Sequence, residues 1–223
     1  MIGNLQFTAD VCPLGLAGAV THLRDLDRFF TDAAAGTLPD FCLVDPDFNA
    51  TSEENPQDVQ AGEQFAARIV QAVMHGKGWP HTLLLWLYDE HGGYYDHVVP
   101  PAAVAPDEVR ARRLGRGWAW LRSVPLVGPW LRRLDRADEG PDTYERLGFR
   151  VPAVAVSPYA RAGQVNSTCF DHTSVLRLVE DKWNLPPLTR RDMRAASPVE
   201  MLDLVGEPAF LSPPVLPQPA RGI

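Results

Sequence analysis

A run of eleven residues, YDEHGGYYDHV at positions 88–98, places acids, histidines and glycines close together. Two carboxylates are adjacent at Asp89 and Glu90, and a third acid precedes a histidine at Asp96 and His97. Carboxylates clustered with imidazoles suit a divalent cation, and Ca²⁺, Mg²⁺, Mn²⁺ and Zn²⁺ are all admissible by ligand type. The run therefore predicts a metal-assisted hydrolytic site and leaves the metal open.

The histidines of this run are the candidates for acid–base chemistry. Asp96 can set the tautomer of His97, which could then bind a phosphate oxygen or protonate a leaving group. His91, beside the acidic pair, is a second catalytic candidate. Gly92 and Gly93 supply the freedom for a tight turn that re-aims the acids. A blander alternative is that the acids cap a turn and that His97 is a surface histidine on a hairpin.

The elements around the run predict an α/β fold. Residues 82–87 (TLLLWL) are apolar without alternation, as in a strand covered on both faces of a parallel sheet. Ligands bind outside the carboxyl ends of such strands, which is where the run lies. A second strand is predicted over residues 41–48, and a helix from Asp58 to His75 that is capped by Asp58 and followed by Gly76. Strand, helix and strand would form a right-handed crossover in a mostly parallel sheet.

Further elements are predicted on either side of this unit. Residues 16–35 have the spacing of an amphipathic helix, and residues 151–156 that of a strand. A helix begins near residues 171–174, where Asp171, Thr173 or Ser174 could act as cap, so we favour capping over catalysis for the adjacent His172. Asp45 and Asp47 end the strand at 41–48; they could approach the site, but turn formation explains them equally well.

Composition limits the class of protein. The 223 residues are 45% hydrophobic and 22% charged, which indicates one soluble globular domain. The net charge of −7 argues against a nucleic-acid partner. No apolar run reaches the length of a membrane span, and the N-terminal residues make a poor signal peptide, so a cytoplasmic location is the default expectation. The dispersed Cys12, Cys42 and Cys169 are expected to be buried as small hydrophobic residues.

A basic insertion interrupts this acidic chain. Residues 110–136 hold eight arginines and one acid, together with Trp118, Trp120 and Trp130. This composition is typical of a segment that lies in the interface of an anionic membrane, but a lid or hairpin packed on the protein body fits equally well. A proline-rich tail, at about 208–223, needs no regular structure.

Three segments together resemble the bacterial phosphoesterase family of phosphatidylcholine-type phospholipases C and acid phosphatases. They are TLLLWLYDEHGGYYDHVVPP, YERLGFRVPAVAVSPYARAG, and FDHTSVLRLVEDKWNLP with TRRD, and the resemblance runs from about Phe41 to Asp192. It implies an alkaline-phosphatase-like α/β/α sandwich that hydrolyses phosphoesters, including phospholipids, with a divalent metal. It also implies that Asp89 and Glu90 are metal ligands and that His97 contacts the substrate phosphate. Family members are often exported.

Parts of the family pattern are missing from this sequence. Neither the Glu-Asn metal-binding motif nor the segment with the Ser or Thr nucleophile is present, so the chain resembles the C-terminal portion of a family member. Where many members have a histidine before a proline, this chain has Asn55 before Pro56. Two hypotheses follow: a truncated or split metal-dependent phosphoester hydrolase, or a catalytically silent remnant that serves as a membrane-surface binding module.

Overall fold

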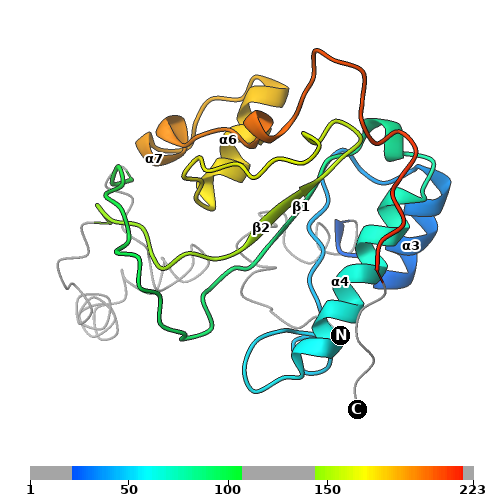
Figure 1. Ribbon diagram of the computed structural model, residues 1–223, viewed down its shortest axis with the longest axis horizontal. Coiled ribbons are helices and arrows are strands. Elements are labelled where there is room, and N and C mark those ends of the chain that lie inside the picture. Colours follow the sequence, from blue (N-terminus) through cyan, green and yellow to red (C-terminus); the bar gives the residue numbers. More distant parts are fainter. Residues whose placement is uncertain (1–21, 107–143, 218–223) are drawn as a thin grey trace, which may run out of the picture.

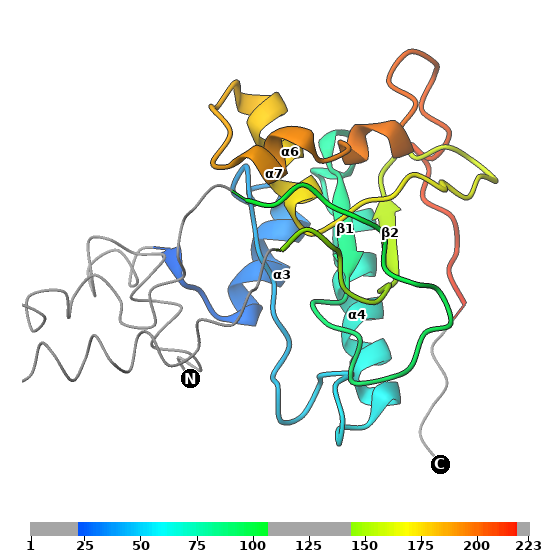
Figure 2. The ribbon, with the colours of Figure 1, turned by 90° about the vertical axis from the view of Figure 1, so that its left-hand side faces the viewer.

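The protein combines helices with a small open sheet in the part of the chain that the computed structural model describes, residues 22–106 and 144–217. Strands β1 (Leu84–Leu87) and β2 (Ala153–Val156) pair in a two-stranded sheet. Figures 1 and 2 show a helix pair on each side of it. One pair is α3 (Leu26–Ala35) with α4 (Val59–Met74), and the other is α6 (Thr173–Trp183) with α7 (Arg190–Arg194). The predicted mixture of helix and strand is confirmed.

The two strands of the described sheet run antiparallel, whereas the sequence predicted a mostly parallel sheet. Leu84 lies opposite Val156, and Leu87 lies opposite Ala153. The apolar run at 82–87 correctly indicated a strand, which the structure has at Leu84–Leu87, but its residues are half-buried and not fully covered on both faces. An apolar run does not determine the direction of the neighbouring strand, which depends on residues far away in sequence.

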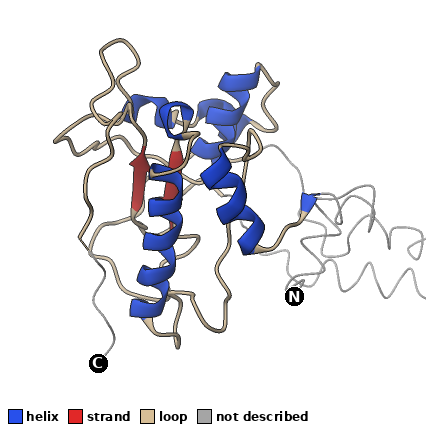
Figure 3. Cartoon of the chain, turned by 90° about the vertical axis from the view of Figure 1, so that its right-hand side faces the viewer, coloured by secondary structure: helices blue, strands red, loops and turns tan. Residues whose placement is uncertain are grey.

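The strand predicted over residues 41–48 is also absent from the described structure. Residues 42–47 have no regular hydrogen bonding, and the side chains of Phe41 and Leu43 are exposed. A turn follows at Asp47, whose side chain accepts a hydrogen bond from the backbone of Asn49 at 2.9 Å. An extended segment becomes a strand only where a neighbour pairs with its backbone, and the described residues supply none here. Figure 3 shows this segment as loop leading to α4.

Capping residues set the ends of α3 and α4. Asp25 caps α3 through the backbone N–H of Arg28, and Gly36 ends it with a φ of 72°. Asp58 caps α4 through Gln60, which confirms the predicted start. The helix predicted over 16–35 begins only at Leu26, because residues 23–25 are not helical and Asp25 caps α3; the part of the prediction before residue 22 lies outside the described residues.

The core forms where α4 meets the sheet. Val73, Met74 and Trp79 are its buried centre, and Leu84 from β1 and Phe210 from the tail pack against it. The tail has no regular structure through residue 217, as predicted. Its contribution to the core was not predicted: the indole N–H of Trp79 donates to the carbonyl of Phe210 at 2.8 Å. The described tail therefore helps to hold the fold together.

The remaining predictions concern the cysteines, the basic insertion and membrane-spanning helices. Cys42 and Cys169 are free and exposed, so the prediction that they are buried is wrong, and Cys12 lies outside the described residues. The whole basic insertion, residues 110–136 with its three tryptophans, also lies outside them. None of the described helices is long and apolar enough to cross a membrane.

Candidate functional site

Tyr88, which directly follows β1 and precedes the acidic run, is held from three directions. Its backbone N–H donates to the carbonyl of Pro152 at 3.4 Å, beside β2. Its hydroxyl donates to Glu53, which precedes α4. Its carbonyl accepts a hydrogen bond from Nε2 of His172, beside α6, at 2.9 Å. Burial, followed by the Glu53 carboxylate, raises the pKa of Tyr88 to about 12. Residues from three distant segments thus fix the end of β1.

The acidic pair follows directly on this anchor. Asp89 and Glu90 are both exposed, and the backbone N–H of Glu90 donates to Oδ1 of Asp89 at 2.9 Å. The turn that follows has positive φ angles of 65° at Gly92 and 78° at Gly93, a conformation that costs glycine little. The two glycines therefore form the tight turn that the sequence predicted, and Asp89 and Glu90 lie between it and β1.

The negative charge of Asp89 acts on a third carboxylate, that of Asp45. Burial raises the pKa of Asp45, and the charge of Asp89 raises it further. That Asp45 belongs to the predicted site, in addition to preceding a turn, stays a prediction. Among the described residues, no three His, Cys, Asp or Glu side chains are close enough together to hold a metal ion.

Asp96 is engaged chiefly by an arginine that the sequence analysis did not select. Its carboxylate accepts two hydrogen bonds from Arg150, at 2.8 and 2.9 Å, and one from the backbone of Val98 at 3.1 Å. The Arg150 guanidinium, above all, holds the pKa of Asp96 well below its usual range. Nδ1 of His97 is 3.7 Å from Asp96, and the His97 side chain is 83% exposed. Asp96 therefore ties the run to the segment before β2, and its contact with His97 is looser.

The other residues of the run have neighbours of their own. The ring of His91 lies 4.8 Å from the ring of Phe149. Tyr94 and Asn55 share a hydrogen bond in which the Asn55 amide donates to the Tyr94 hydroxyl at 3.0 Å. Asn55 is the position at which the resemblance implies a histidine, and this hydrogen bond brings it to the acidic run. The roles of His91 and His97 in chemistry stay predictions.

The segment before α6 contains the predicted cap and His172, for which the sequence favoured capping over catalysis. Asp171 accepts a hydrogen bond from the backbone of Thr173 at 2.7 Å, and its own N–H donates to Ser174 at 3.1 Å, so capping is confirmed. The His172 side chain makes no capping hydrogen bond and extends to Tyr88 instead. The sequence did contain a sign that His172 has another role. Histidine is not among the preferred N-cap residues, so capping does not explain why a histidine stands at this position.

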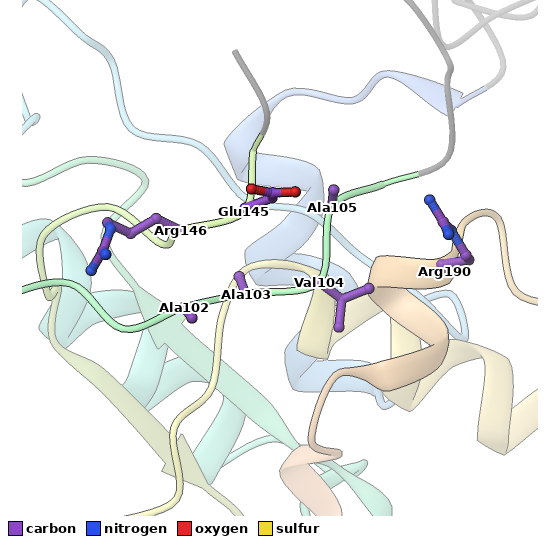
Figure 4. Close-up of a pocket in the computed structure, with 7 residues that line it drawn as sticks. All are labelled: Ala102, Ala103, Val104, Ala105, Glu145, Arg146 and Arg190. Atoms are coloured by element: carbon purple, nitrogen blue, oxygen red, sulfur yellow. The ribbon is translucent and has the colours of Figure 1, made fainter. Parts of the chain in front are cut away.

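A shallow groove lies apart from these residues. It has a volume of about 640 Å³ and is lined by residues 102–105 together with Glu145, Arg146 and Arg190. Figure 4 shows Glu145 and Arg190 on opposite sides of Val104. None of the predicted site residues lines it. The candidate site is therefore the exposed end of β1, where Tyr88 leads into Asp89 and Glu90.

Comparison with known proteins gives consistent matches. The sequence profile described as the phosphoesterase family matches residues 15–186. Non-specific phospholipase C6 of Arabidopsis thaliana is 29% identical over 215 residues, which are 89% of this chain and 37% of that protein. Non-hemolytic phospholipase C of Pseudomonas aeruginosa is 29% identical over 192 residues, 83% of this chain and 26% of that protein. Phospholipase C A of Mycobacterium tuberculosis is 30% identical over 160 residues, which are 71% of this chain and 28% of that protein. The chain thus spans between 26% and 37% of the length of these relatives.

Proposed function

This chain belongs to the phosphoesterase family, and we propose that it takes part in the metal-dependent hydrolysis of phosphoester bonds. The observation that carries the proposal is the position of Asp89 and Glu90 at the anchored end of β1. The relatives named phospholipase C support a phospholipid or other phosphoester as the substrate. An alkaline-phosphatase-like sandwich is the fuller fold that we propose for the domain.

Two carboxylates at this end of β1 are of the kind that binds a divalent cation, and a complete site would need further ligands, because no three His, Cys, Asp or Glu side chains of the described residues lie close enough together to hold one. Asp89, Glu90 and Asp45 offer carboxylate oxygens, which hard cations prefer, and the first two are exposed. The mutual repulsion of Asp45 and Asp89 is a cost that a bound cation would relieve. We propose Asp89 and Glu90 as the ligands, with Asp45 assisting through its charge. When bound, such a cation polarises a phosphoryl oxygen and stabilises the charge that develops on it.

The protein's own residues would then position the substrate. His97 is exposed at the far end of the run, where it can donate a hydrogen bond to a phosphate oxygen or a proton to a leaving group. The Arg150–Asp96 pair fixes the backbone from which His97 projects. His91, which packs on Phe149, is the second candidate for proton transfer. A nucleophile, which the sequence motifs do not supply, is required for the covalent route of catalysis.

Chromogenic esters test the proposal. Release of p-nitrophenol from p-nitrophenyl phosphate and from bis(p-nitrophenyl) phosphate should require added Mn²⁺ or another divalent cation, and should fall at least tenfold in the Asp89→Asn variant. The relative rates on the two esters would separate a monoesterase from a diesterase. A well-folded sample without metal-dependent turnover, unchanged by Asp89→Asn, would instead support the second hypothesis, a silent remnant that acts as a binding module.

A further inference from the structure

The hydrogen bond between His172 and Tyr88 joins two segments that are 84 residues apart in the sequence. Its acceptor is the carbonyl oxygen of Tyr88, so Nε2 of His172 must carry the proton and act as donor. This carbonyl belongs to the peptide unit that also contains the N–H of Asp89. Because a peptide unit is planar, a hydrogen bond that orients the Tyr88 carbonyl also orients the first backbone group of Asp89.

Hydrogen bonds of Asp171 and Ser174 fix the backbone on either side of His172. The Asp171 carboxylate accepts from both the backbone N–H and the hydroxyl of Thr173, at 2.7 and 2.5 Å, and lies 3.5 Å from Arg191 of α7. Ser174 is buried and accepts from the N–H of Asp171. The cap of α6 therefore holds the backbone on both sides of His172, while the imidazole stays available for Tyr88.

From these contacts we infer that His172 is a positioning residue for the acidic pair, an inference that rests on the proposed function of Asp89 and Glu90. The β-sheet ends at Leu87, and the flexible turn begins at Gly92. Between them, the hydrogen bond from His172 is the contact that sets the direction of the peptide leading into Asp89. His172 acts through Tyr88 and fixes the backbone from which the two carboxylates project.

Hydrogen–deuterium exchange measures this role without reference to activity. Removing the side chain in the His172→Ala variant should speed exchange of the Tyr88 and Tyr94 amides, which flank residues 89–93 and donate to the carbonyls of Pro152 and His91, by about fivefold, the equivalent of one hydrogen bond of about 1 kcal/mol. The His172→Gln variant should exchange within twofold of the unmodified protein, because the glutamine amide can donate to the same carbonyl. The matched control is His75→Ala, which removes another histidine that hydrogen-bonds a carbonyl, that of Gln71 at 2.9 Å in α4.

Three results would overturn the inference. They are unchanged exchange in His172→Ala, equally fast exchange in His172→Ala and His172→Gln, and faster exchange that extends through α4. Calorimetric titration with Mn²⁺ provides the second readout: the affinity should fall in His172→Ala and recover in His172→Gln. If the unmodified protein binds no Mn²⁺ and hydrolyses no ester, the proposed function fails, while the exchange data still decide whether His172 orders residues 89–93.

Discussion

The close packing of Gly62 against Glu53 leads to a prediction about the hydrogen bond between Glu53 and Tyr88, which follows β1. Gly62 lies in the first turn of α4 and is buried under the segment that carries Glu53. A Cβ atom at position 62 would lie 2.2 Å from Cγ of Glu53, and 3.1 Å from the backbone nitrogen of Glu53 and the carbonyl carbon of Ser52. The Gly62→Ala variant must therefore move the Glu53 side chain, which accepts the hydrogen bond from Tyr88.

The expected magnitude follows from two opposing effects. Alanine is favoured over glycine within a helix by about 1 kcal/mol. A hydrogen bond to a charged group contributes about 1.5–3 kcal/mol, and the crowded backbone contacts at 3.1 Å add a further cost. We therefore expect Gly62→Ala to lower the free energy of unfolding by about 1–2 kcal/mol, although helix propensity alone predicts an increase.

Urea denaturation at neutral pH measures this change, and a double-mutant cycle with Tyr88→Phe identifies its cause. In the Tyr88→Phe background the hydrogen bond is already lost, so Gly62→Ala should be close to neutral. The control is Gly148→Ala, where an added Cβ meets nothing within 4 Å. The reasoning is refuted if Gly62→Ala is as stable as the unmodified protein, or if its cost is the same with and without the Tyr88 hydroxyl.

Three other predictions concern titration and membranes. The folded protein raises the pKa of Tyr88 from 10 to about 12, so the stability from this group is present below pH 10 and is lost as the pH rises through 12. The free energy of unfolding, measured by denaturation, should fall by roughly 1–2 kcal/mol across this pH window, a figure that is lowered because Tyr88 is partly exposed. The Tyr88→Phe variant should show no such fall. Burial and then Asp192 raise the pKa of Glu180, which is 7% exposed, so stability is lost as the pH rises above 4.5. At pH 7 the Glu180→Gln variant should be at least as stable as the unmodified protein. If the variant is still more stable than the unmodified protein below pH 4.5, ionisation of Glu180 is not the cause. Replacing Trp118, Trp120 and Trp130 by alanine should reduce cosedimentation with anionic liposomes, and equal binding would exclude an interfacial role.

Local patterns predicted the elements that flank the site. The Asp58 cap and the apolar spacing after it gave α4, and the apolar run at 82–87 gave β1 with the acidic pair at its end. These features depend only on residues a few positions apart, so they can be predicted from the local sequence. The capping segment before α6 was readable for the same reason.

Contacts between distant segments could not be predicted in this way. The antiparallel partner of β1 lies 66 or more residues further along the chain, and no local pattern records its direction. The Arg150 contact with Asp96 and the Phe210 contact with Trp79 likewise depend on how the chain folds back on itself. His172 was assigned to a cap because its neighbours are good caps, although its side chain contacts Tyr88.

The dependence of ester hydrolysis on Mn²⁺ concentration tests the central claim most directly. We expect p-nitrophenol release to rise and saturate with Mn²⁺ in the unmodified protein, and the Mn²⁺ concentration for half-maximal rate to increase at least tenfold in Asp89→Asn and Glu90→Gln. The control Asp27→Asn alters an acid in the first turn of α3 and should leave the curve unchanged. Identical curves for the unmodified protein, Asp89→Asn and Glu90→Gln would contradict the assignment of these residues as the metal ligands.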